Sequence, residues 1–225
     1  METLSLEDSI GILNIYESKN APNKLFFEGN LSYLSSARKV SVVGSRKATK
    51  EGIKRAAIIT ELLISKGIIV VSGLAEGIDT IAHTTTIQKG GQTITVLGTP
   101  LNKTYPKKNE HLLQKIKNEH LAVSQFPKDH PVQPKNFIMR NHTMALISDA
   151  TIIVEAGEKS GSRYQGWETL RLGRELFLLE SLANDPKLSW PKEMIKYGAK
   201  VLTRNSITHF LDDLPEFTTS KNATF

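Results

Sequence analysis

Residues 67 to 83, GIIVVSGLAEGIDTIAH, decide the fold. The apolar, β-branched run at 68–71 has the length of a buried strand and is too short for a helix. Ser72, Gly73 and Gly77 interrupt this run, and the residues from Ile78 onward favour a helix. A buried strand, a turn of small residues and a helix start together create a place for an anion, because backbone N–H groups point out of the helix end. The rest of the chain repeats this plan.

The composition is that of a globular protein with a substantial core. The 225 residues are 39% hydrophobic and 23% charged, which suits one large α/β domain or one domain with an appendage. No apolar run approaches the roughly 20 residues that span a bilayer, and the N-terminal stretch METLSLEDSI is acidic rather than basic. The absence of cysteine excludes disulfides, thiolate metal ligands and a cysteine nucleophile. We therefore expect a cytoplasmic protein that does not associate with a membrane.

The net charge of +6 is unevenly distributed along the chain. Residues 1–35 carry a charge of −3, so the remainder carries +9. A basic body of this size favours a polyanionic partner, and nucleic acid is the commonest one. The alternative is that the charge serves solubility alone.

From Lys39 onward, short β-branched runs alternate with longer helical stretches. This alternation is typical of a parallel sheet with crossover helices, so the predicted fold class is α/β, with a doubly wound, mostly parallel sheet of extended Rossmann-like type. Residues 1–23 are expected to form a short N-terminal helical segment, 24–213 the Rossmann-like domain, and 214–225 a loose polar tail. Strands are predicted at 25–27, 40–43, 68–71, 93–97, 121–123, 151–154, 176–179 and 200–202, and helices within the first 20 residues and at 50–66, 78–89, 109–118, 137–148, 164–173 and 191–197.

Ligands of such a sheet bind outside the carboxyl ends of the strands, so the turns that follow the strands are the candidate site. Gly44 leaves room for a ligand, Ser45 offers a hydroxyl group, and Arg46 can hold a phosphate in a bidentate fork. A helix-capping serine beside a surface arginine is the alternative interpretation. The tripeptide at 160–162, Ser-Gly-Ser, provides another helix start suited to an anion.

The stretch FIMRN at 137–141 opens a helix after a proline-rich loop. Lys135, Arg140 and Asn141 can face an anion there, with Phe126 and Phe137 as stacking rings. Aromatic rings between basic residues are what a surface for single-stranded nucleic acid needs, because bases stack while phosphates pair with cations. The alternative is that these two rings belong to the core.

Three further polar residues stand out near the predicted turns. Glu155 ends a buried strand, where it either accepts hydrogen bonds from backbone N–H groups of neighbouring turns or holds a ribose hydroxyl or a base. Asp79 and His83 lie four residues apart on one helix, as an acid–base pair, half a metal site, or hydrogen bonds that tie the helix to a loop. The other histidines lack metal-ligand spacing, and neither a G-x-G-x-x-G motif nor a P-loop occurs, so we expect no metal and no cofactor.

These motifs together resemble the DprA/Smf family of DNA-processing proteins. The resemblance covers roughly residues 24 to 203, and its specific part is SGLAxGID…AH combined with F-x-x-RN. The chain departs from the usual family pattern at Ser124-Gln125, at Gln165-Gly166 and over 180–190. The motifs that carry the resemblance are GSR (44–46), SGLAEGIDTIAH (72–83), VLGTPLNKTYP (96–106), FIMRN (137–141) and VEAGEKSGS (154–162).

The resemblance implies a non-catalytic, dimeric protein that binds single-stranded DNA during DNA uptake, natural transformation and recombination, with a recombinase such as RecA as a partner. It implies that Ser45, Arg46, Ser72, Gly73, Arg140, Asn141, Ser160, Gly161 and Ser162 line a basic phosphate-binding pocket. To this set the residue-by-residue analysis adds Gly44, Lys135 and Glu155.

Two alternatives of other classes stay open. Similar folds occur in nucleotide-sensing domains of defence or toxin-antitoxin systems and in phosphoribohydrolases that cleave nucleoside monophosphates. The paired glycines of those enzymes are absent here and Glu168 lies too far along its helix, so we expect no enzymatic activity. A subunit that kept the fold and lost its ligand is the other alternative, against which the retained Arg46 and Arg140 argue.

Overall fold

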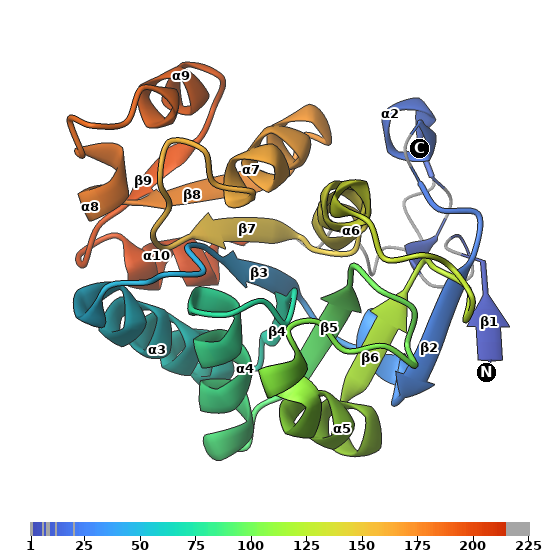
Figure 1. Cartoon of the computed structure of the whole chain (residues 1–225). Coiled ribbons are helices and arrows are strands. Elements are labelled where there is room, and N and C mark those ends of the chain that lie inside the picture. Colours follow the sequence, from blue (N-terminus) through green and yellow to red (C-terminus); the bar gives the residue numbers. More distant parts are fainter. Residues whose placement is uncertain (1, 6, 8–9, 12, 20, 215–225) are drawn as a thin grey trace.

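The computed structural model describes residues 2–5, 7, 10–11, 13–19 and 21–214 of the chain. They form one nine-stranded sheet with the order β1-β2-β6-β5-β4-β3-β7-β8-β9, and helices cover both of its faces (Figure 1). The strands are β1 Glu2–Leu4, β2 Leu25–Gly29, β3 Lys39–Val43, β4 Ile69–Ser72, β5 Thr93–Leu97, β6 Leu121–Ser124, β7 Ala150–Ile153, β8 Glu175–Leu179 and β9 Lys200–Leu202.

All pairings among strands β3 to β9 are parallel. Strands β1 and β2 add an antiparallel edge, in which β1 pairs with β2 and β2 pairs with β6. The strand order reverses between β3 and β7, because β4, β5 and β6 follow β3 on one side and β8 and β9 follow β7 on the other. Such a reversal is the switch point at which doubly wound sheets bind ligands.

Helices on the two faces complete the layers. In Figure 1, α6, α7 and α9 lie on one side of the sheet, and α3, α4 and α5 lie on the other. Within the described part of the chain, the α-helices are α2 Ile15–Ser18, α3 Lys50–Ser65, α4 Ile78–Gln88, α5 Glu110–Glu119, α6 Pro134–Leu146, α7 Ser162–Arg171, α8 Glu180–Ala183, α9 Trp190–Lys196 and α10 Ile207–Asp212.

The core explains why these runs become central strands. Every residue of β3, β4, β5, β6 and β7 is buried, as expected for strands that are covered on both faces. On α3 the residues that pack inward include Ala56, Ile59 and Leu63, spaced three and four apart on one helical face.

The predicted fold class is confirmed, and the predicted central strands and long helices agree with the structure within a few residues. The helix predicted over the first 20 residues is wrong at its start, because Glu2–Leu4 pairs with Leu25–Phe27 as an antiparallel strand. Helices α8 and α10 were missed. The predicted tail falls outside the described residues except for Leu214, which is buried. In the part of the chain that the structure describes, no helix is both long and apolar enough to cross a membrane.

Candidate nucleic-acid interface

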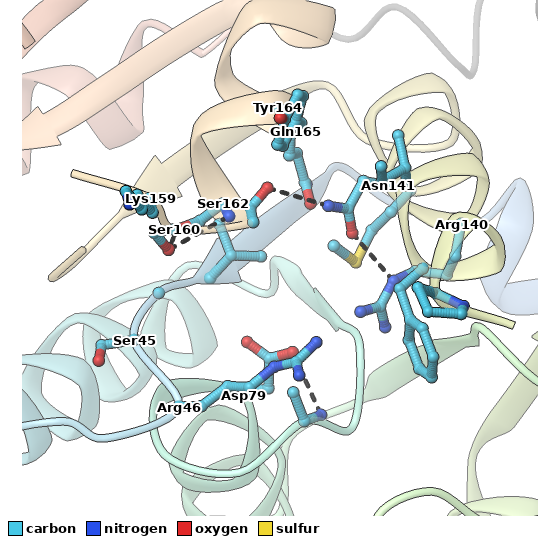
Figure 2. Close-up of a pocket in the computed structure, with 18 of the residues that line it drawn as sticks. Ser45, Arg46, Asp79, Arg140, Asn141, Lys159, Ser160, Ser162, Tyr164 and Gln165 are labelled. Carbon is cyan, nitrogen blue, oxygen red and sulfur yellow. Dashed lines mark hydrogen bonds between the residues drawn. The ribbon is translucent and has the colours of Figure 1, made fainter. Parts of the chain in front are cut away.

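A pocket of about 830 Å³ opens at the carboxyl edge of the sheet, beside the switch point between β3 and β7 (Figure 2). The turn after β3, the start of α4, the helix α6 and the start of α7 all contribute to its walls. The lining includes Gly44, Ser45, Arg46, Asp79, Tyr105, Val132, Phe137, Ile138, Arg140, Asn141, Lys159, Ser160, Gly161, Ser162, Tyr164 and Gln165.

The turn after β3 is held in place by backbone contacts. The N–H of Ser45 donates to the carbonyl of Glu155 at 2.6 Å, and the carbonyl of Ser45 accepts from the N–H of Ile78 at 3.2 Å. Glycine is required at two positions nearby, because a Cβ on Gly44 would lie 2.6 Å from Glu155 O and one on Gly77, which has a φ of 75°, would overlap Ser45 O. The turn therefore presents Arg46, which is exposed, at a fixed place on the rim.

Arg140 is the buried cation of the pocket. Its Nη1 donates to the carbonyls of Gly73 and Val96, the latter at 2.9 Å, and its Nε donates to Asn141 Oδ1 at 3.0 Å. Burial lowers the pKa of Arg140, and the nearby Asp79 carboxylate opposes this shift. Because an arginine remains charged under such conditions, the pocket contains a fixed positive charge.

Asp79 and His83 do not form a mutual pair in the described structure. Asp79 accepts a hydrogen bond from Ala75 N at 3.3 Å, while burial raises the pKa of its carboxyl group against the attraction of Arg140. His83 Nδ1 lies 2.8 Å from Thr93 Oγ1, and burial lowers the pKa of His83 to about 3. Each side chain thus ties α4 to a neighbouring segment. The described residues contain no group of three or more potential metal ligands.

The start of α7 forms the opposite wall. Ser160 Oγ and Ser162 Oγ lie 2.7 Å apart, and the carbonyl of Gly161 accepts from Asn141 Nδ2 at 3.1 Å. Lys159 is exposed beside them. The first N–H groups of α7 already donate to Ser160 and Gly161, so this helix start attracts an anion through the positive end of its dipole, and Lys159 adds a full charge at the same place.

The third wall is apolar and aromatic. The rings of Tyr105 and Phe137 lie 5.3 Å apart in a tilted arrangement, and the guanidinium of Arg46 lies 5.7 Å from the centre of the Phe137 ring. Val132 and Ile138 are partly exposed on the same side. A flat base can stack on such a wall while its phosphate faces the cations.

The structure brings most of the predicted site residues to this pocket. Of the predicted stacking rings, Phe137 lines it, whereas Phe126 is buried and packs on His130 with the ring centres 4.8 Å apart. Eight of the predicted residues lie in the lining, namely Gly44, Ser45, Arg46, Arg140, Asn141, Ser160, Gly161 and Ser162, and their contact with a ligand stays a prediction.

The other four predicted residues lie outside the lining, and three of them support it. Ser72 is buried and donates to Val42 O at 2.7 Å, and a Cβ on Gly73 would overlap the Arg140 guanidinium. Glu155 accepts from Thr49 N at 2.9 Å and from Thr49 Oγ1, so the first of its two predicted roles is the one the geometry favours. Lys135 is exposed beyond the pocket.

Several lining residues were missed from the sequence. Lys159 directly precedes the predicted Ser160 turn, so a wider window around that turn would have found it. Tyr105 lies in the motif at 96–106 and Gln165 at a departure from the family pattern, whereas Val132 carries no such signal, because a loop brings it in through tertiary packing.

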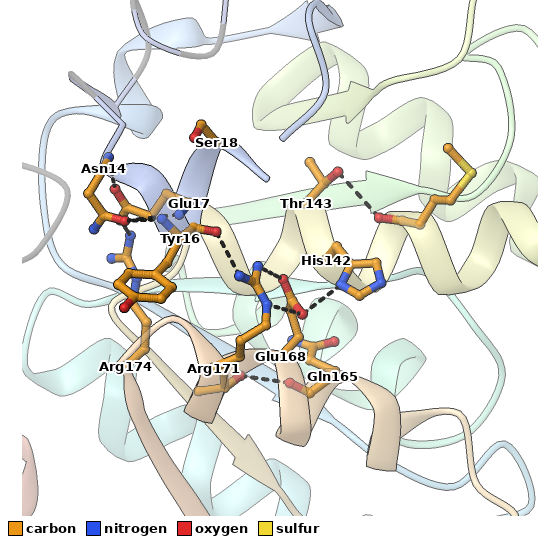
Figure 3. A network of polar contacts seen from close by, with 12 residues as sticks. Asn14, Tyr16, Glu17, Ser18, His142, Thr143, Gln165, Glu168, Arg171 and Arg174 are labelled. Carbon is orange, nitrogen blue, oxygen red and sulfur yellow. Dashed lines mark hydrogen bonds and ion pairs between the residues drawn. The ribbon is translucent and has the colours of Figure 1, made fainter. Parts of the chain in front are cut away.

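A polar network outside the pocket joins α6, α7 and the N-terminal segment (Figure 3). Glu168 Oε2 lies 2.9 Å from His142 Nδ1, and both carboxylate oxygens accept hydrogen bonds from Arg171. Although burial alone would raise the pKa of Glu168, the bonds from Arg171 and His142 lower it to about 2. Arg171 Nη1 also donates to Tyr16 O at 2.7 Å, so this network fixes α2 against α7.

Comparison with known proteins gives the same result as the motifs. The model of the family described as DNA recombination-mediator protein A matches residues 11–214. The chain is 34% identical to the DNA processing protein DprA of Bacillus subtilis over 195 residues, which is 87% of this chain and 65% of that protein. It is 36% identical to the DprA of Streptococcus pneumoniae over 202 residues, covering 89% of this chain and 71% of that one.

A solved structure gives further support. DNA processing protein A from Helicobacter pylori, described for its single-stranded DNA binding mode, superposes with a TM-score of 0.80 at 26% identity, covering 96% of this chain and 98% of that one. The chain thus spans about two thirds of the length of the B. subtilis relative and nearly all of the solved H. pylori chain. The resemblance in the motifs is confirmed, and the chain belongs to the DNA recombination-mediator protein A (DprA/Smf) family.

Proposed function

We propose that this chain binds single-stranded DNA through its backbone phosphates and acts in DNA processing during uptake and recombination. The observation that carries the proposal is the composition of the pocket walls. Arg46, Arg140 and Lys159 place three positive charges around one cavity, and the start of α7 adds the positive end of its helix dipole. These groups are suited to phosphates of any sequence, so the expected binding is largely sequence-independent.

The aromatic wall favours a single strand over a duplex. Tyr105 and Phe137 offer ring faces to a base, and bases in a duplex are already stacked on each other and turned inward. A relative of this chain, the H. pylori protein, is described for single-stranded DNA binding, which supports the same ligand here.

The surroundings of the two carboxylates considered for catalysis, Glu168 and Asp79, support a binding role. Glu168 lies outside the pocket lining, and its carboxylate is engaged by Arg171 and His142. Asp79, which does line the pocket, is held by the N–H of Ala75 at the base of the cavity. We therefore propose that the chain binds its ligand without catalysis.

We further propose that the protein works as a homodimer in the cytoplasm and delivers bound DNA to a recombinase of the RecA type. The support for these partners is membership of the family. Light scattering of the purified chain tests the dimer, with twice the mass expected for a chain of 25.0 kDa. A monomer at all concentrations would contradict it.

Fluorescence anisotropy tests the DNA proposal directly. Labelled single-stranded and duplex oligonucleotides of the same sequence are titrated with the chain, and a mononucleotide serves as competitor. We expect tight binding of the single strand, at least tenfold weaker binding of the duplex, and little competition by the mononucleotide.

Two variants locate the binding surface. Arg46→Gln should weaken binding of every single-stranded sequence alike, whereas Arg204→Gln removes the same charge from an exposed position outside the pocket and should have little effect. If neither DNA binds while the mononucleotide does, the proposal is wrong and the pocket belongs to the nucleotide-sensing class.

A further inference from the structure

A second pocket, of about 660 Å³, opens outside the carboxyl ends of β8 and β9, at the left of Figure 1. Its walls come from α3, from the residues that follow β8 and β9, and from the start of α10. We call this pocket the α3 groove. None of its described lining residues also lines the pocket at the switch point, so the two sites are separate.

The floor of the α3 groove is aliphatic. On α3, Ile58 and Leu62 lie four residues apart and therefore on the same face of the helix. Ile58 is 59% exposed although it lies in the middle of this helix. Burial of such surface by a partner is favourable. The aliphatic lining residues are Ile58, Ile59, Leu62, Leu179, Leu202 and Ile207.

Two arginines flank this floor from different walls. Arg55 is half-buried on α3, three residues before Ile58, and Arg204 is exposed after β9. Neither guanidinium makes an ion pair or a hydrogen bond with any residue that the structure describes. Glu180 is the single acid among the described lining residues, so the groove carries a net positive charge. A guanidinium fork matches a carboxylate in shape and charge.

The lining favours an acidic peptide over a nucleic acid. None of the described lining residues is aromatic, so a base has no ring on which to stack. Because the two arginines stand on different walls of an aliphatic floor, a ligand that pairs with both carries two acidic groups with an apolar group between them. A peptide in which Asp or Glu flanks a bulky apolar residue has this pattern. The volume lies in the range of pockets that hold a few side chains, so a short segment fits better than a globular face.

Part of the groove is particular to this chain. Glu180 and Ser181 begin the stretch 180–190, at which the sequence departs from the usual family pattern. In the structure this stretch starts with α8, whose Leu182 and Ala183 are buried while Glu180 and Ser181 are exposed at the groove. The wall that differs from the family is thus also the wall that a partner would contact.

We propose that the α3 groove docks a short acidic segment of a partner protein. A bulky apolar side chain of the segment lies on the aliphatic floor, and its carboxylates pair with Arg55 and Arg204. This interaction goes beyond the proposed DNA binding, because the groove shares no described lining residue with the other pocket and can be occupied while DNA is bound.

Selection from a random peptide library tests the docking site without knowledge of the partner. Phage that display random short peptides are selected on the immobilised full chain, and the enriched peptides are synthesised with a fluorescent label. Anisotropy then measures their binding to the parent, Ile58→Glu, Arg55→Gln and Arg204→Gln. The matched control is Ile15→Glu, at a 79% exposed position of α2.

We expect the enriched peptides to combine acidic with bulky apolar residues. Ile58→Glu should weaken their binding about tenfold or more, because it removes an apolar contact and repels carboxylates. Each arginine variant should weaken it about three- to tenfold. Ile15→Glu and saturating single-stranded DNA should change it less than about twofold. Thermal unfolding of each variant verifies its folding, and the arginine variants carry the test should Ile58→Glu fold poorly.

Several results would overturn the docking site. They are the absence of enriched peptides, enriched peptides without acidic residues, and peptides that bind all three groove variants as tightly as the parent. Displacement of the peptide by single-stranded DNA would assign the groove to the DNA-binding surface. A dimer of the parent that Ile58→Glu converts to a monomer in light scattering would assign it to a second copy of the chain. If the parent binds the peptides as expected but binds no DNA, the proposed function fails and the docking site stands.

Discussion

Replacing Gly73 by alanine tests how the structure holds the buried cation of the pocket. A Cβ at this position would overlap Nη1, Nη2 and Cζ of Arg140, so the guanidinium has to move. The movement breaks the bonds from Arg140 Nη1 to the carbonyls of Gly73 and Val96. Backbone strain is not the cause, because Gly73 is absent from the positive-φ glycines among the described residues.

The magnitude follows from these two bonds. A hydrogen bond that involves a charged group contributes about 1.5–3 kcal/mol, which gives an upper limit of roughly 3–6 kcal/mol for the pair. The displaced guanidinium can turn into the open pocket and regain water, so we expect a loss of about 2–4 kcal/mol in unfolding free energy. For a chain of this size that corresponds to a fall in the unfolding midpoint of roughly 5–15 °C. The affinity for single-stranded DNA should fall about tenfold or more, because the guanidinium of Arg140 leaves the position in which we propose that it binds a phosphate.

Urea unfolding and anisotropy measure the two effects on the same preparation. Gly157→Ala is the matched control, because nothing lies within 4 Å of a Cβ added there although Gly157 also lines the pocket. Its unfolding free energy should stay within about 0.5 kcal/mol of the parent. If Gly73→Ala is as stable as the parent and binds DNA equally well, the position assigned to Arg140 is wrong.

Three further predictions concern residues around the pocket. Glu155→Ala should lower the unfolding free energy by about 2–4 kcal/mol, because Thr49 loses its charged acceptor at the start of α3, and it should change the DNA affinity less than about twofold. A tenfold loss of affinity at unchanged stability would instead make Glu155 a ligand contact. The pKa of Glu168 is lowered to about 2, so the charged carboxylate should stabilise the chain relative to the Glu168→Gln variant by on the order of 2 kcal/mol; this effect should be complete above about pH 4.5 and disappear as the pH falls through 2. Urea unfolding at several pH values would contradict this if the difference in unfolding free energy between the two proteins stayed constant. Lys135→Gln should weaken DNA binding less than about threefold in the anisotropy assay, because Lys135 is exposed beyond the lining, and a loss as large as that of Arg46→Gln would move the interface onto this rim.

Much of the fold and of the pocket could be predicted because their signals are local. The run at 68–71 is β-branched and ends in glycine and serine, so strand and turn are encoded within a few residues. The same holds for the turn at 44–46 and the helix start at 160–162, both of which line the pocket. Once the sheet is known to be parallel, these turns must meet at one edge.

The one error and the alternatives that the sequence left open occur where tertiary contacts decide. A three-residue strand such as Glu2–Leu4 is too short to show a period, and its pairing with β2 becomes visible only when the sheet is assembled. Phe126 and Phe137 are equivalent as letters in the sequence, yet one is buried against His130 and the other faces the cavity. The role of Glu155 depends on Thr49, more than 100 residues away in the chain.

The salt dependence of single-stranded DNA binding is the most direct test of the central claim, that cations of this pocket bind backbone phosphates. Dissociation constants are measured across a salt series for the parent chain, for Arg46→Gln and for Arg204→Gln. The account predicts a steep dependence in the parent, a slope of the logarithmic plot that is shallower by about 0.7 in Arg46→Gln, since one phosphate contact is lost, and an unchanged slope in Arg204→Gln. A parent slope near zero, or the same slope in all three proteins, would contradict it.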